Sequence, residues 1–221
     1  GYKQRVFDHY PSIQPNIFGL SEGINNVYQH AGIPYENLFL TPNGLDIDAY
    51  RFTDKPKYSE RSICIGKIED RKKQFFLQRI DSLWFAGNIA DNRFNQDKNY
   101  LGEIPKSQIK TDLTDYGNLV LISDGEVHPR VCTEALAAGL GVVISECGIA
   151  NLDLDKPFIT VIPDSRIDDI EYIESQIIIN RGYSISHKHD ILEYARQFDW
   201  DNIINQYYIP SINKIRSHYV S

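Results

Sequence analysis

Methionine is absent from the sequence, and only 3 of the 221 residues are cysteine. The cysteines, Cys64, Cys132 and Cys147, have no C-x-x-C spacing, which argues against a disulfide framework and against a zinc site. We therefore expect free, buried thiols and no bound metal. No apolar run approaches the ~20 residues that a transmembrane helix needs, and no signal peptide is visible, so we expect no transmembrane segment.

Basic residues are also scarce relative to acidic ones. The chain has 23 Lys and Arg against 30 Asp and Glu, which gives a net charge of -7. A diffuse nucleic-acid surface needs the opposite balance, so nucleic acid is not an expected partner. The length suffices for one large domain, or one domain plus a part of another. Because no methionine stands even at the first position, we expect that the chain was processed or cut from a longer one.

Short apolar runs with strand character alternate along the chain with segments of helical period. The runs are continuous rather than alternating, which is typical of strands buried on both faces of a parallel sheet. We expect strands at 62–65, 83–86, 100–101, 119–122, 142–144 and 158–162, with helices between them at 71–81, 106–116 and 130–138. This order predicts an α/β fold with a Rossmann-like, doubly wound parallel sheet over residues 48–199. Its buried positions are expected to include Ile65, Phe85, Leu121, Ile144 and Val161.

The two ends of the chain differ from this middle part. Further elements are predicted there, namely strands at 16–21 and 38–40 and helices at 22–31, 167–180 and 191–198. A Pro-Asn-Gly turn and a polar, proline-bearing stretch at 46–60 indicate a domain boundary, so residues 1–47 are interpreted as the tail of an amino-terminal domain. The last segment, 200–221, is expected to be a crossover helix that Pro210 kinks or breaks.

Ligands bind to open parallel sheets at the carboxyl ends of the strands. The segment after the first sheet strand begins with Gly66, which lets the backbone approach a ligand. It then places four cations within seven residues at the start of a helix, namely Lys67, Arg71, Lys72 and Lys73. Cations at a helix start are costly unless an anion lies between them, so the pattern predicts a phosphate site. A solvated charge run on a helix face is the alternative.

Two further segments follow strand ends. Gly102-Glu103-Ile104-Pro105 is a tight strand-to-helix turn that can present backbone groups to a flat base. Glu126 and Glu134, eight residues apart around a helix start, can accept hydrogen bonds from sugar hydroxyls in a cleft. Taken alone, the turn and the two acids also have ordinary structural explanations. His128 lies between the glutamates and is weighed as a general base, although a loop histidine is more often a surface or capping residue.

Together these segments resemble the nucleotide-sugar-binding half of GT-B glycosyltransferases of the retaining group-one type, also called family 4. The matching segments occur in the family's order and are LFLTPNGLDIDAYRF at 38–52, Gly66-Lys67 followed by Lys72, EVHPRVCTEALAAGLG at 126–141, and Phe198-Asp199-Trp200. They resemble the interdomain segment, the phosphate motif, the Glu-seven-residues-Glu motif with its small-residue helix, and the start of the last segment. The resemblance covers about residues 18–208.

The resemblance implies transfer of a sugar from a nucleoside diphosphate sugar to a hydroxyl acceptor with retention of configuration. No metal or other cofactor is implied, because fixed cations stabilise the leaving diphosphate. Glu126, Lys67 and Lys72 are then catalytic residues, with Glu126 at the hydroxyls of the donor sugar. The implied nucleotide contacts are Gly66, Gly102, Glu103, Ile104, Arg130, Val131 and Glu134, the last of these at the ribose hydroxyls.

The acceptor implied by the resemblance is a sugar, a lipid-linked molecule or a protein. It is held by the amino-terminal domain, of which only the last part resembles this chain, so we expect the enzyme to be incomplete in this chain alone. We expect a cytoplasmic protein, either free or associated with a membrane surface.

Two departures from the family pattern keep other functions open. Val127-His128-Pro129 stands where the family has Gly-aromatic-Gly, and Pro129 has no N–H to offer to a ligand. Gly141 replaces a proline. A non-catalytic module that binds a nucleotide sugar or a partner protein is one alternative, and a sugar-nucleotide epimerase on the same architecture is another. Turnover of the donor to free sugar, transferred sugar or epimer separates them.

Overall fold

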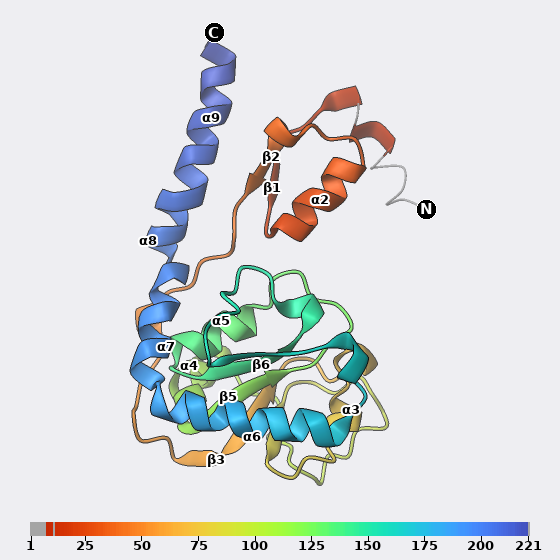
Figure 1. The fold of residues 1–221 in the computed structure, drawn as a ribbon, viewed down its shortest axis with the longest axis vertical. Coiled ribbons are helices and arrows are strands. Elements are labelled where there is room, and N and C mark those ends of the chain that lie inside the picture. Colours follow the sequence, from red (N-terminus) through yellow and green to blue (C-terminus); the bar gives the residue numbers. More distant parts are fainter. Residues whose placement is uncertain (1–7, 11, 221) are drawn as a thin grey trace. The chain divides into compact units, whose positions relative to one another are not determined.

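A computed structural model of the chain describes residues 8–10 and 12–220 and divides into two compact units (Figure 1). The larger unit is Leu45–Gln197. The smaller unit combines Gly1–Gly44 with Phe198–Ser221. In the described part of the chain, no helix is both long enough and apolar enough to cross a membrane.

The larger unit is built on a parallel sheet of five strands in the order β4-β3-β5-β6-β7. The strands are β3 (Tyr58–Ile65), β4 (Leu83–Ala86), β5 (Tyr116–Leu121), β6 (Gly141–Ser145) and β7 (Ile159–Ile162). In the middle of the sheet, Leu119 of β5 pairs with Ile63 of β3 and with Val142 of β6. All five strands are parallel, and β4 and β7 form the two edges. The predicted α/β fold with a Rossmann-like parallel sheet is confirmed.

Helices cover both faces of this sheet. They are α3 (Gln74–Leu77), α4 (Lys106–Asp112), α5 (Arg130–Ala137), α6 (Ile170–Ser186) and α7 (Lys188–Ala195), with short 3₁₀ helices at η2 (Ile47–Ala49), η3 (Asp70–Lys72), η4 (Leu113–Asp115), η5 (Glu146–Gly148), η6 (Asp164–Arg166) and η7 (Arg196–Phe198). Helix α6 lies across β3, β5, β6 and β7, and its Ile173 and Ile177 pack with Val120 and Val143 (Figure 1). Helix α5 contacts β5 and β6. Side chains alternate between the two faces along each strand, and every residue of β5 and β6 is buried, so both faces of the sheet are covered in its middle.

Some sequence-based expectations about this unit are wrong. Residues 100–101 form no strand, because Tyr100 makes only an isolated bridge to Phe85. The helix expected over 71–81 is divided into η3 and the four-residue α3, because Lys73 between them adopts a left-handed conformation with φ of 52°. Phe85, Leu121 and Ile144 are buried as expected. Ile65 and Val161 are only half-buried, since Ile65 ends its strand beside a cavity and Val161 lies on the edge strand β7.

A buried polar network joins α6 to the middle of the sheet. Asn180 of α6 donates through Nδ2 to the carbonyl oxygens of Val142 at 3.2 Å and Phe158 at 3.0 Å. Its Oδ1 accepts a hydrogen bond of 2.9 Å from Nδ2 of Asn118 on β5. Asn118 Nδ2 also donates to the carbonyl of Ile177 at 3.1 Å, and its Oδ1 accepts from Ser62 on β3. Both asparagines are fully buried, so each hydrogen bond replaces a lost contact with water.

Replacing Asn180 by alanine should therefore destabilise the larger unit strongly. The Asn118 amide and two strand carbonyls lose partners in a dry environment, and we predict a loss of about 2–4 kcal/mol in the free energy of unfolding. Denaturant unfolding measures it. The neighbouring Ile179→Ala, at a side chain that is 52% exposed, is the control and should change the free energy by less than about 0.5 kcal/mol. Equal losses in the two variants would show that the network is energetically unimportant.

Lys188 is buried at the start of α7, where its ammonium ties two loops together. Its Nζ donates to the carbonyl oxygens of Thr114 and Gly139, both at 3.3 Å. The pKa of this lysine is lowered to about 8, chiefly because the side chain is buried; Asp115 and Asp54 oppose this effect and Arg51 adds to it. The charged form is therefore less stable in the folded chain than in the unfolded one.

This lysine should make stability depend on pH. Between the folded pKa of about 8 and the ordinary value near 10.5, the unfolded chain binds more protons, so the free energy of unfolding rises with pH. We predict that the wild-type chain gains about 1 kcal/mol over Lys188→Met between roughly pH 7.5 and 9. Thiols and tyrosines that titrate nearby are common to both chains and cancel in the difference. A difference that stays constant over this range would rule out a depressed pKa.

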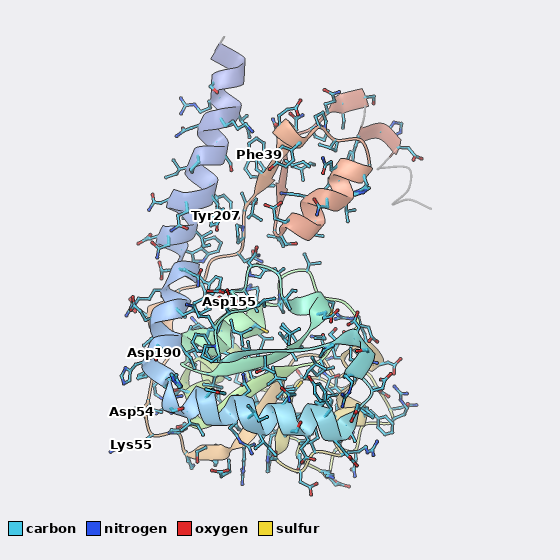
Figure 2. All side chains as sticks on the ribbon, viewed as in Figure 1. Phe39, Asp54, Lys55, Asp155, Asp190 and Tyr207 are labelled. Carbon is cyan, nitrogen blue, oxygen red and sulfur yellow. The ribbon has the colours of Figure 1, made fainter. Side chains whose placement is uncertain are left out.

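The smaller unit has its own short sheet. Strands β1 (Ile17–Gly19) and β2 (Leu38–Leu40) pair in parallel, and the further elements are α2 (Glu22–His30), η1 (Tyr35–Asn37), α8 (Trp200–Ile203), η8 (Ile204–Tyr208) and α9 (Ile209–Val220). Phe39 of β2, labelled in Figure 2, stacks on Phe18 with ring centroids 5.5 Å apart, and Lys214 of α9 lies 5.4 Å from its ring centroid. Pro210 does not break the last helix, because the π-helical turn η8 directly precedes it and accommodates the missing N–H.

Candidate functional site

Two glycines, one after β3 and one after β4, let the backbones at the carboxyl ends of these strands come into close contact. Gly66 has φ of 149° and Gly87 has φ of 143°, values that favour glycine. A Cβ on Gly87 would lie 2.0 Å from the carbonyl oxygen of Gly66, and a Cβ on Gly66 would lie 2.9 Å from Nζ of Lys72. The group that comes close to Gly66 in this structure is thus the ammonium of Lys72, a lysine of the same loop.

Five charged side chains form a network in which the sign alternates, and we call it the charge chain. Its members are Lys67, Glu69, Arg71, Glu126 and Lys72, in that order. Lys67 Nζ lies 3.5 Å from Glu69 Oε2, and Arg71 Nη2 donates to Glu69 Oε1 at 2.9 Å. Glu126 Oε1 accepts from Arg71 Nη1 at 3.1 Å and lies 3.8 Å from Lys72 Nζ. The charge chain carries three cations and two carboxylates, so it keeps one net positive charge.

Hydrogen bonds of Arg71 connect the loop after β3 to the loop after β5. Its Nη1 donates to Ser123 Oγ at 2.9 Å and to the carbonyl oxygen of Gly125, and its own carbonyl accepts from the N–H of Asp124 at 2.9 Å. Hydrogen bonding to Arg71 also lowers the pKa of Glu69. The structure thus pairs Lys72 with Glu126 and connects Lys67 to them through Glu69 and Arg71. The sequence marked Arg71 only as one of several cations.

Lys73 does not belong to this cluster, contrary to the expectation of four clustered cations. Its left-handed backbone sends the side chain to Asp124 and Asp168, whose carboxylate oxygens each lie 3.3 Å from Nζ. The helix that follows has only four residues, so it supplies no extended dipole to the site. The anions between the remaining cations are Glu69 and Glu126 of the chain itself.

Glu134 lies on α5, with a side chain that is only 6% exposed. Its Oε1 accepts a hydrogen bond from the ammonium of Lys106, the first residue of α4, and the Lys106 side chain is half exposed. This ion pair joins α4 to α5. It also brings the turn that ends at Pro105, and with it Ile104, close to α5. Sequence reasoning missed Lys106, because 28 residues separate the pair and no local pattern connects them.

The turn predicted to face a base borders a cavity. Gly87 N–H donates to the carbonyl of Gly102 at 3.0 Å and holds the turn along the end of β4. Gly102 has φ of 81°, and the space where its Cβ would lie is open. A cavity of about 300 Å³ between α4 and β3 is lined by Glu103 and Ile104, together with the half-buried Ile65 and Leu101. Its lining also includes Lys57, Tyr58, Asp115 and Tyr116, at the amino ends of β3 and β5. These predicted contacts therefore lie beside a cavity that is lined by both polar and apolar side chains.

The start of α5 carries the remaining predicted contacts. Arg130 and Val131 are its first two residues, and their N–H groups have no helical carbonyl to bond to. Arg130 is exposed and Val131 is half-buried. Pro129 precedes them as the cap residue without a side-chain hydrogen bond. His128 is buried, and burial together with Arg130 lowers its pKa, which keeps the imidazole neutral at neutral pH.

The described part of the chain contains no cluster of metal-binding side chains. No group of three or more His, Cys, Asp or Glu side chains there is arranged to hold an ion.

No protein-family model matches the sequence, and no curated protein matches it. Solved structures do resemble it. Sucrose-phosphate synthase from Thermosynechococcus elongatus matches 99% of this chain and 63% of its own length, with a TM-score of 0.72 and 15% identity. The pneumococcal O-GlcNAc transferase GtfA, solved with UDP and GlcNAc, matches 97% of this chain and 48% of its own length, with a TM-score of 0.72 and 14% identity. Anabaena HepE, solved with UDP-glucose, matches 90% of this chain and 63% of its own length, with a TM-score of 0.67 and 15% identity.

These likenesses concern the fold, since the identities are low. At that level the expected resemblance to GT-B glycosyltransferases is confirmed. The chain spans between 48% and 63% of the length of these three proteins.

The ion pair between Lys106 and Glu134 leads to a stability prediction. Lys106→Met leaves a buried carboxylate without its partner, and we predict a loss of about 1–3 kcal/mol in the free energy of unfolding at neutral pH. The loss should shrink in Lys106→Met/Glu134→Gln, where the charge is removed as well. Lys98→Met breaks an exposed pair with Asp81 and is the control, with an expected change below about 1 kcal/mol. Denaturant unfolding of the four chains gives the comparison, and a Lys106→Met chain as stable as Lys98→Met would show that the pair is not needed.

Proposed function

We propose that the chain is the donor-binding half of a retaining, metal-independent GT-B glycosyltransferase, which uses a nucleoside diphosphate sugar and a hydroxyl acceptor. One observation carries the proposal. Three cations and Glu126 meet in the charge chain at the carboxyl end of the sheet, while Glu134 lies further along α5 beside the turn at 102–105. The fold likeness to proteins solved with UDP, GlcNAc or UDP-glucose supports it.

In this proposal the diphosphate binds to Lys67, Lys72 and the free N–H groups at the start of α5. The bond between the anomeric carbon and the diphosphate oxygen breaks, the acceptor oxygen forms the new bond on the same face, and the acceptor proton leaves with the diphosphate. Negative charge grows on the leaving oxygen, and fixed cations stabilise that charge more in the transition state than in the ground state. The lysines thereby supply what a metal ion supplies in other enzymes.

Glu126 meets the hydroxyls of the donor sugar in this arrangement, and Glu134 meets the ribose. Glu126 Oε1 already faces Arg71 and Lys72, so its carboxylate is oriented before a ligand arrives. The base lies against Gly102, Glu103 and Ile104, next to the cavity under α4.

A second candidate function is a binding module without turnover. It is favoured by the engagement of Glu126 with two cations and by Pro129, which offers no N–H at the start of α5. Such a module binds the nucleotide sugar as proposed but does not release or transfer the sugar.

Nucleotide binding tests the proposal, and Lys73 offers a matched control for Lys72. We predict that one of UDP, GDP and ADP at about 100 times its Kd raises the unfolding free energy by about 2.7 kcal/mol, which a thermal-shift assay detects. Lys72→Ala should weaken binding of that diphosphate about tenfold or more, because a charge-assisted contact is lost, while binding of the free nucleoside stays nearly unchanged. Lys73→Ala, one residue away but directed to Asp124 and Asp168, should bind as the wild type does.

The outcomes separate the functions. No shift with any of the three diphosphates at millimolar concentration rejects a nucleotide site altogether. Binding of UDP-glucose or UDP-GlcNAc with no release of free sugar over hours favours the binding module, whereas slow release to water favours a transferase. Equal weakening by Lys72→Ala and Lys73→Ala would reject the assignment of Lys72 to the diphosphate.

A further inference from the structure

Tyr50 has a buried hydroxyl that the packing of the larger unit does not explain. The residue follows η2 and is only 6% exposed. Among the residues that the structure describes, none forms a hydrogen bond with its Oη, and water does not reach it. A buried hydroxyl without a partner is costly, and a phenylalanine of the same shape would avoid the cost. The orphan hydroxyl therefore indicates a partner other than the residues that the structure describes.

The surroundings of Tyr50 are those of the candidate nucleotide site. The turn η2 packs against α5, the helix that carries Arg130 and Glu134. Those two residues are four positions apart and share one face of that helix. From the other side, Lys110 of α4 lies 5.9 Å from the centroid of the tyrosine ring. Tyr50 therefore lies between the two helices that the Lys106–Glu134 ion pair joins.

The charges of Glu134 and Arg130 act on this hydroxyl. The pKa of Tyr50 is raised, chiefly because the side chain is buried and next because of the Glu134 carboxylate, while Arg130 acts in the opposite direction. The phenol is therefore protonated at neutral pH and available as a donor. Glu134 uses Oε1 for Lys106, and a carboxylate has two oxygens, each able to accept more than one hydrogen bond. A phenol donor and a carboxylate acceptor thus belong to neighbouring elements, since η2 packs against α5.

We propose that Tyr50 and Glu134 together hold a vicinal diol, the ribose of the nucleotide, with Glu134 accepting from one hydroxyl and the Tyr50 hydroxyl donating to the diol. A diol has both donors and acceptors, so the pair matches it better than two carboxylates or two phenols do. The ligand reaches both groups by displacing the half-exposed Lys106 side chain. This inference rests on the proposed nucleotide site and adds a residue that sets specificity in it.

The test compares Tyr50→Phe with a matched tyrosine elsewhere. The control is Tyr194→Phe, because the hydroxyl of Tyr194 accepts a hydrogen bond of 2.8 Å from the N–H of Asp153 and is not an orphan. Isothermal titration gives Kd for UDP, 2′-deoxy-UDP and 3′-deoxy-UDP, and thermal unfolding gives Tm of the ligand-free proteins. Glu134→Gln is measured alongside as the reference for the carboxylate.

Opposite effects on stability and binding are expected for Tyr50→Phe. Its Tm should rise by a few degrees, because the unpaired buried hydroxyl is gone. Its Kd for UDP should rise about fivefold, the effect of one neutral hydrogen bond, and this increase should disappear for at least one deoxy analogue. Tyr194→Phe should show a lower Tm and an unchanged Kd.

Three results would overturn the inference. If Tyr50→Phe leaves Kd for UDP unchanged while Glu134→Gln raises it, Tyr50 makes no ligand contact but the proposed site stands. If Tyr50→Phe lowers Tm and weakens UDP and both deoxy analogues equally, the hydroxyl has a structural role. If the wild-type protein binds no UDP and no other nucleoside diphosphate, the proposed function fails, and this inference fails with it.

Discussion

Parallel strands can be joined only by crossovers that bring the chain back to the same end of the sheet, and the candidate site depends on this constraint. Because of it, the loops after β3, β4 and β5 lie at the same end of the sheet, the carboxyl end of its strands, although they are far apart in sequence. Arg71 then links two of these loops, and the Lys106–Glu134 pair links the helices that follow them. The buried hydrogen bonds of Asn180 attach α6 to one face of the sheet and so stabilise the strands that carry these loops.

Much of this fold could be predicted from the sequence, because continuous apolar runs and helical periods are local signals. The strand at 83–86 was predicted with its observed bounds, and the centres of the other four sheet strands were identified. Predictions failed where the chain departs from regular geometry. Lys73 takes a left-handed conformation without being glycine, which ends the helix expected over 71–81. The regular α-helix is interrupted next to Pro210 by a π-helical turn at Ile204–Tyr208, and no residue pattern marks such a turn.

The candidate site was predictable to the extent that its residues follow strand ends. Lys72 lies 3.8 Å from Glu126 and Lys67 connects to them through Glu69 and Arg71, because each of the three lies in a loop after β3 or β5. Their partners were not predictable, since Arg71 and Lys106 contact residues 55 and 28 positions away. Tyr50 lay inside a segment interpreted as a linker, and an aromatic residue there carries no sign that its hydroxyl will be left unpaired. Which side chains neutralise one another is a tertiary property, and it decides which cations face a ligand.

The alternating signs of the charge chain have a consequence for the entropy of binding. Long lysine and arginine side chains lose rotamer freedom when they close on a ligand, and here much of that loss has already occurred in the free protein. An anion bound at the proposed diphosphate site would take the place of Glu69 and Glu126 at these cations instead of ordering loose side chains. Such a site releases fewer counterions than its three cations alone would, so its affinity varies less steeply with ionic strength than that of an open basic patch. The acids among the cations thus make the site less sensitive to its ionic surroundings.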